Sequence, residues 1–215
     1  MKVVKCRRLG SYPISDARWR PDPMRAHGAW IYLFLSIGAG ALVGTFRAVE
    51  PALLAGTGFA GAFLVLAAVH VGPRKKLRQL LLGTALTVFA PVLAVWLGAK
   101  PVFLFPAALT LLPACTAIVL AKNSGALSPA TLVSGIAALT MSAPVTAFAG
   151  GSSPLPSAIL YIFLWSFFSW RALRIANSLV PGVGWNRELL RIQGLREAAL
   201  SAIWTLAVAL GLRLA

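Results

Sequence analysis

The sequence predicts an all-α protein, a polytopic transmembrane bundle of about seven helices with its N-terminus in the cytoplasm. Hydrophobic residues make up 59% of the chain and charged residues 12%, whereas a soluble domain has roughly 25% charged residues. The charges gather between long apolar blocks. The first block, residues 29–46, carries no charge, and at about 1.5 Å per residue it spans about 27 Å, close to the thickness of a bilayer core. These observations indicate a membrane protein.

A basic arm, residues 1–28, precedes the first apolar block. It is rich in Lys and Arg and contains Pro13, Pro21 and Pro23. A secretory signal has a short basic region followed by a brief apolar run and a cleavage site, and this arm is too long for that pattern. We therefore expect a cytoplasmic arm over 1–28 and a transmembrane helical domain over 29–215.

Six further apolar blocks follow, each bounded by Pro, Gly or basic residues. The sixth span is expected to end near Trp170, because Arg171 and Arg174 would each cost about 3 kcal/mol at the bilayer centre. The seventh is short and crosses only if Arg213 reaches outward or the bilayer thins locally, so six spans with a C-terminal interfacial helix are the alternative. The predicted further spans are 51–71, 79–98, 102–121, 130–149, 157–170 and 198–212.

The loop charges support seven spans and predict their orientation, because Lys and Arg of short loops collect on the cytoplasmic side. With the N-terminus inside, only Arg47, Lys100 and Arg213 of the 20 basic residues lie on the other side. Residues 185–197 predict an amphipathic helix in the inner interface, with an ordinary loop as the alternative. The expected partners are the lipid bilayer and its anionic headgroups. Despite a net charge of +15, no nucleic acid is expected, because the charges do not share one folded face.

Small residues mark places where helices are expected to approach closely. Gly40 and Gly44 form a G-x-x-x-G pair in the first helix, and small residues crowd the second, so we expect these two helices to pair. Prolines inside the third, fourth and fifth helices favour kinks. The predicted packing glycines are Gly40, Gly44, Gly56, Gly58 and Gly61.

Acidic residues are few, and all fall outside the predicted spans: Asp16, Asp22, Glu50, Glu188 and Glu197. Proton relays and cation-coupled transporters usually carry an ionisable residue at membrane depth, so these classes lose support. The last helix lacks the lysine that a retinal protein needs for its Schiff base, and the predicted spans hold no carboxylate pair for acid–base catalysis. The sequence therefore favours a protein that is not an enzyme.

Two candidate sites lie at the predicted cytoplasmic ends of the helices. His27 opens the first helix and His70 closes the second, so the pair is a candidate ligand set for haem iron or another metal; hydrogen bonding at the interface is the plainer role. The second candidate is a basic rim for a phosphate or lipid headgroup, although positive-inside bias alone would produce the same charges. No cofactor is identified. The rim residues are His27, Arg74, Arg78, Lys122, Asn123, Arg171 and Arg174.

The run His27-Gly28-Ala29-Trp30, preceded by Pro23 and Arg25, resembles the Pro-Arg-x-His-Gly-Ala-Trp motif of the YwiC-like integral membrane proteins. The basic stretch 169–174 and the number of apolar blocks are also similar to that family. Residues 122–129 lack the acid that family members carry after the fourth helix. The resemblance implies a multi-pass protein of the bacterial inner membrane without an established activity.

The leading functional hypothesis is an accessory, assembly or structural subunit of a larger membrane complex, because no predicted span carries catalytic side chains. The alternative is a protein that handles lipid or isoprenoid phosphates at the basic rim. A third hypothesis is a small-solute transporter, whose cavity would lie beside the helix prolines and be contacted by Thr110, Thr116, Thr140 and Ser142.

Overall fold

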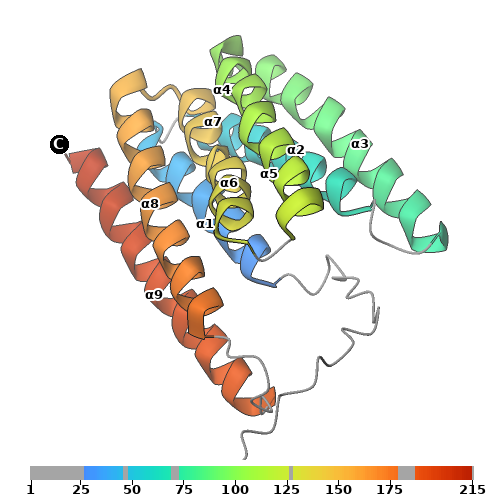
Figure 1. Ribbon diagram of the computed structural model, residues 1–215. Helices are drawn as coiled ribbons and strands as arrows, with labels where there is room; N and C mark the ends of the chain where they lie inside the picture. The colour runs from blue at the N-terminus through green and yellow to red at the C-terminus, as the bar shows by residue number, and fades with distance from the viewer. Residues whose placement is uncertain (1–26, 46–47, 69–72, 126–127, 179–186, 215) are drawn as a thin grey trace, which may run out of the picture.

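The computed structural model describes residues 27–45, 48–68, 73–125, 128–178 and 187–214, and every regular element among them is helical (Figure 1). The elements are α1 (His27–Val43), α2 (Val49–Ala68), α3 (Pro73–Trp96), the 3₁₀ helix η3 (Pro101–Phe103), α4 (Leu104–Leu109), α5 (Leu111–Ser124), α6 (Pro129–Thr140), α7 (Ser142–Ala149), α8 (Pro154–Ser178) and α9 (Arg187–Leu214). Because η3–α4–α5 and α6–α7 each form one broken helix, the segments number seven. Six are long and apolar enough to cross a membrane, and the first is shorter. The predicted polytopic helical membrane protein is confirmed.

The short first helix, α1, lies at the centre of the bundle, where α2, α6, α7, α8 and α9 pack around it (Figure 1). Its 17 residues give a length of about 26 Å. The helix ends at Val43 and not at Phe46 as predicted, because the Thr45 backbone N–H donates to the Gly150 carbonyl at 2.7 Å. This hydrogen bond turns the chain toward the end of α7. We call the end of the bundle where α1 begins the arm end, and the opposite end the far end.

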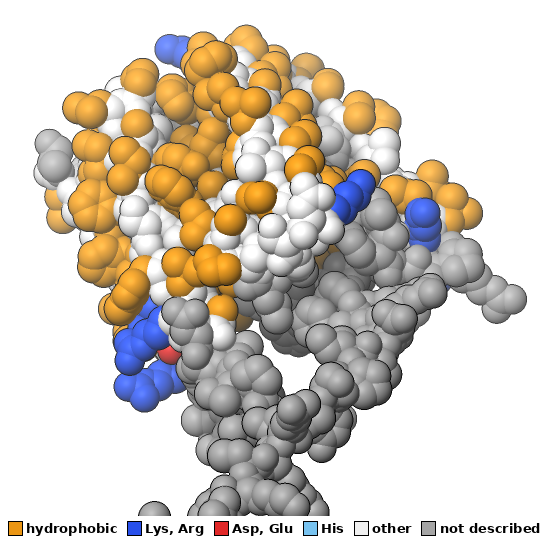
Figure 2. All heavy atoms as spheres, viewed as in Figure 1, with side chains coloured by type: hydrophobic (Ala, Val, Ile, Leu, Met, Phe, Trp, Pro, Cys, Tyr) orange, Lys and Arg blue, Asp and Glu red, His pale blue; other side chains and the backbone are white. Residues whose placement is uncertain are grey.

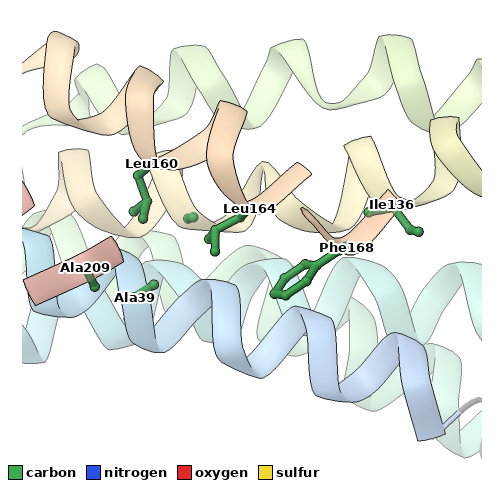
Figure 3. Packing of buried hydrophobic residues seen from close by; sticks show 7 residues of the cluster. Ala39, Ile136, Leu160, Leu164, Phe168 and Ala209 are labelled. Atoms are coloured by element: carbon green, nitrogen blue, oxygen red, sulfur yellow. The ribbon is translucent and has the colours of Figure 1, made fainter. Parts of the chain in front are cut away.

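A buried apolar cluster joins α1 to the helices that cover it. Figure 3 shows Leu160, Leu164 and Phe168 of α8 together with Ala39 of α1 and Ala209 of α9. All of these side chains are at most 1% exposed. Alanines on α1 and α9 allow the two backbones to approach, and the larger side chains of α8 fill the space beside them. The cluster therefore fixes the three helices relative to one another.

The predicted packing glycines lie at helix contacts, but the helices that they face differ from the expectation. A Cβ on Gly40 would overlap Thr146 and the Ala143 carbonyl of α7, and a Cβ on Gly44 would lie 3.0 Å from the Gly150 Cα. The first helix thus packs its G-x-x-x-G face on α7, which the sequence did not predict. In α2, Gly56 faces Ile37 of α1, whereas Gly58 faces Pro91 and Gly61 faces Leu86, both of α3.

Two of the predicted proline kinks are breaks in the helix. The fourth segment is interrupted at Thr110 and the fifth at Met141. Each break falls three residues before a proline, which is Pro113 in the first case and Pro144 in the second. A proline ring clashes with the carbonyl four residues earlier, so the break falls where this clash acts. The Thr110 hydroxyl donates to the Pro106 carbonyl at 3.0 Å, and this kind of bond also bends helices. Pro91, by contrast, lies inside an unbroken α3.

The last two helices extend beyond their predicted limits. α8 continues past Trp170 to Ser178, and its candidate span includes both Arg171 and Arg174. The amphipathic helix expected at 185–197 is not a separate element from Arg187 onward, because α9 runs without interruption to Leu214; residues 185 and 186 lie outside the described part. The span predicted at 198–212 accordingly lengthens to 194–214. An ion pair joins the two extended helices and involves one charge from each, Arg171 and Glu197, both of which the sequence predictions had placed outside the spans.

Candidate functional site

The predicted basic rim is spread along the arm end and does not converge on one point. Arg78, Lys122, Asn123 and Arg174 are all exposed, and visible Lys and Arg side chains border the lower edge of the coloured surface in Figure 2. The helices that carry these residues have different neighbours, because α3 packs on α2, α5 on α6, and α8 on α6, α7, α1 and α9. The exposed rim residues therefore offer separate positive charges along an edge.

The predicted histidine pair stays a prediction. His27 is the first residue of α1 and Arg74 lies in the first turn of α3, but their side chains are outside the described part, as is the whole of His70. Among the residues that the structure describes, no three His, Cys, Asp or Glu side chains come together as a metal-binding group.

Arg171 occupies a different setting from the rest of the rim, because it is buried and paired with an acid. Its guanidinium forms an ion pair and a hydrogen bond with the Glu197 carboxylate of α9. The Arg171 side chain is 8% exposed and that of Glu197 is 19% exposed. Glu197 lies inside a candidate span, so the expectation that every acid lies outside the spans is wrong. Either charge alone would be costly at this position, and pairing makes both tolerable.

Aromatic rings surround this ion pair. The Trp170 ring centroid lies 5.5 Å from the Arg171 guanidinium carbon and 5.9 Å from that of Arg174. On the inner side, Tyr32 of α1 stacks on Phe168 with ring centroids 4.4 Å apart. The Tyr32 phenol also lies within range of the charges of Arg171 and Glu197. The pair is thus flanked by an exposed Trp170 and a buried aromatic stack.

Four hydroxyls of α1, α8 and α9 are buried and have no hydrogen-bond partner among the described residues. They belong to Ser36 of α1, Ser169 of α8, and Ser201 and Thr205 of α9, and Arg171 Nε is in the same condition. An unsatisfied buried polar group costs about 1 to 3 kcal/mol, so such a concentration calls for a physical cause. Ser169 lies one turn after Trp165, whose indole donates to the Val133 carbonyl of α6, so Ser169 is on another face of α8 than Arg171. We call the remaining set, completed by Glu197, the polar seam: Ser36, Arg171, Glu197, Ser201 and Thr205.

The hydroxyls expected to face a transported solute are already engaged. Thr110 donates to Pro106, Thr116 to Leu112 and Thr140 to Ile136, all at carbonyl oxygens of their own helix. Ser142 likewise donates to the Leu139 carbonyl. These groups shield backbone carbonyls at the helix breaks, which is the usual use of Ser and Thr in bent membrane helices.

A pocket of about 530 Å³ opens at the far end of the bundle. Arg213 of α9 lies at its wall and donates to the Leu42 carbonyl at the end of α1, at 2.7 Å. This bond ties the last turn of α9 to the last turn of α1. The pocket is lined by Val43, Gly44, Thr45, Ser152, Pro156, Leu212 and Arg213. None of these residues was predicted from the sequence as part of a binding site, although Gly44 was predicted as a packing glycine.

The polar seam was also missed, although the sequence carries a signal for it. Glu197, Ser201 and Thr205 are spaced four residues apart, and this spacing places them on one face of a helix. The prediction of a separate interfacial helix over 185–197 placed Glu197 in a different element from Ser201 and Thr205, so their common face was not recognised. Comparison with known proteins adds no further assignment, because no protein-family model, no curated protein and no solved structure matches this chain.

Proposed function

We propose that this polytopic membrane protein is a non-catalytic accessory or assembly subunit that contacts a larger membrane complex through α3, α4 and α5. The observation that carries the proposal is the packing of α5, none of whose residues is buried. The outer faces of these helices are apolar, and Trp96 is 80%, Phe89 71% and Phe105 68% exposed. Helices with one packed side leave most of their circumference to lipid or to another protein's helices.

The proposal also includes the orientation of the protein and the membrane in which it lies. The basic arm end is assigned to the cytoplasm, and the membrane to a bacterial inner membrane, on the strength of the Lys and Arg distribution and of the His27–Trp30 run that resembles the YwiC-like proteins. In this orientation the exposed cations of the arm end meet anionic headgroups. The lipid bilayer itself is a partner of every apolar span.

The association through α5 is testable with its own cysteine, because Cys115 is free and exposed. In a Cys6→Ser background, a maleimide photocrosslinker on Cys115 is expected to give one discrete adduct in native membranes, whose second protein is identified by mass spectrometry. The control is Cys6→Ser/Cys115→Ser/Leu206→Cys, which moves the probe to an exposed position on α9. Lipid adducts alone at Cys115, or the same mixture of adducts at both positions, would contradict the proposal.

Lipid- or isoprenoid-phosphate handling is the second candidate function, and the arrangement of Arg174 favours it. Arg174 is exposed and stands over the exposed Trp170 ring, which is the usual pairing of cation and indole at a membrane interface. A surface cation contributes about 1 kcal/mol toward an anionic headgroup, so Arg174→Ala is expected to weaken phosphatidylglycerol binding about fivefold.

The measurement for this second candidate is native mass spectrometry of lipid retained in nanodiscs. Lys76→Ala is the matched control, because it removes an exposed cation of equal charge from α3 that is not one of the rim residues. Equal loss of lipid from both variants would indicate general charge attraction and count against a site at Arg174. The transporter hypothesis receives the least support, because the hydroxyls assigned to its solute path donate to their own helices.

A further inference from the structure

Hydroxyl groups in the spans fall into two sets according to what they donate to. Thr87 donates to the Gly83 carbonyl at 2.7 Å, and Thr146 donates to the Ser142 carbonyl at 2.8 Å, each one turn back on its own helix. The hydroxyls of the polar seam do not donate to a carbonyl one turn back on their own helix. They have no partner among the described residues although each of the three residues is more than nine-tenths buried: Ser36, Ser201 and Thr205.

The unpartnered hydroxyls of the seam lie on two helices that pack against each other. Ser36 is on α1, and Ser201 and Thr205 are on α9, which meet α8 around the cluster in Figure 3. Ala39 and Ala209 belong to that cluster, so one turn back from each, toward the arm end, the chain reaches Ser36 and Thr205 at the same level. The polar seam therefore runs along α9 from Glu197, near the arm end, to Thr205.

The polar groups of the seam restrict which kind of molecule can complete their hydrogen bonds. An apolar guest would leave the hydroxyls unsatisfied, and a charged guest would disturb an ion pair that is already neutral. Water donates and accepts, is small enough to lie between helices, and ordinarily takes 2 to 4 polar partners where it is buried. Beyond Thr205 the lining is apolar, being formed by Ala39, Leu160 and Ala209.

We propose that the polar seam holds a file of internal water molecules, which leads from the arm end past the Arg171–Glu197 pair and stops at Thr205. The file is a blind inlet and not a channel, because the apolar cluster closes it toward the far end. It keeps the Glu197 carboxylate in contact with water at the arm end. This inlet is independent of the association proposed for α3, α4 and α5, which lie on other parts of the fold.

Hydrogen–deuterium exchange of single thiols tests the inlet directly, because the infrared S–H band shifts when water delivers deuterium. In a Cys6→Ser/Cys115→Ser background of the full chain, Ser201→Cys and Thr205→Cys are compared with Ala209→Cys, which lies one turn further along the same helix. In D₂O the first two thiols are expected to exchange about 100-fold faster than the third, whose exchange needs local opening of the packed cluster.

The outcomes separate cleanly. Exchange at Thr205→Cys as slow as that at Ala209→Cys overturns the inlet, and exchange at Ala209→Cys as fast as that at Thr205→Cys overturns its closure. Should Ala209→Cys fail to give a monodisperse protein on gel filtration, Ala147→Cys replaces it, because Ala147 of α7 is also 0% exposed.

Discussion

Glu197→Ala lowers the stability of the protein by about 3 kcal/mol, because it leaves the buried Arg171 without its acid. Removing one member of a buried pair strands the other charge, for which the described residues offer no second carboxylate. The effect is expected in SDS-induced unfolding of the detergent-solubilised protein, followed by Trp fluorescence. Glu50→Ala is the control, since Glu50 is exposed in the first turn of α2, and its loss costs less than about 1 kcal/mol.

A second variant separates the charge from the shape of the site. Arg171→Met/Glu197→Leu removes both charges and keeps similar volume, so most of the stability lost in Glu197→Ala is expected to return. Equal losses in Glu197→Ala and Glu50→Ala would show that the pair does not matter. A double variant as unstable as the single one would show that the pair contributes through packing and not through charge.

Gly40→Ala is expected to destabilise the protein by about 3 kcal/mol, because the added Cβ meets atoms that cannot move away easily. That Cβ would overlap the backbone carbonyl of Ala143 and the side chain of Thr146, both of α7. Overpacking of this kind usually costs about 1 to 3 kcal/mol, and contact with backbone places Gly40 at the upper end. The whole face between α1 and α7 has to separate to make room.

Gly38→Ala is the matched control for this substitution, two residues away on the same helix. A Cβ at Gly38 meets nothing within 4 Å, so this variant is expected to keep wild-type stability. The two variants are compared by thermal unfolding in the same detergent. Similar melting temperatures for Gly40→Ala and Gly38→Ala would disprove the close contact between α1 and α7.

The number and approximate limits of the helices were predictable, because they follow from the hydropathy of the sequence. In lipid every backbone group must bond within its own helix, so apolar blocks bounded by Pro, Gly and charge become helices. The breaks near Thr110 and Met141 follow from Pro113 and Pro144 for a local reason. The pairing of the helices was less predictable, because Gly40 indicates a close helix contact but does not indicate which helix makes it. Only tertiary packing assigns it to α7.

The site was harder to predict than the fold, because its charges are unfavourable one at a time. Arg171 was placed outside the spans by the cost of an isolated ion, and Glu197 by its assignment to an interfacial helix. The cost of each buried charge falls only when both are present. Nothing local in residues 171 or 197 identifies the other as its partner. A prediction made from one segment at a time therefore ends the sixth span too early and begins the seventh too late.

The central position of α1 has a consequence for the order in which the protein is made. α1 is synthesised before α7, α8 and α9, although these three helices pack against it. At about 5 to 20 residues per second, α9 is completed about 10 to 30 s after α1. During that interval the future core helix faces lipid with its Gly40 side and Ser36 uncovered. The described bundle therefore closes around α1 only after α9 has been synthesised.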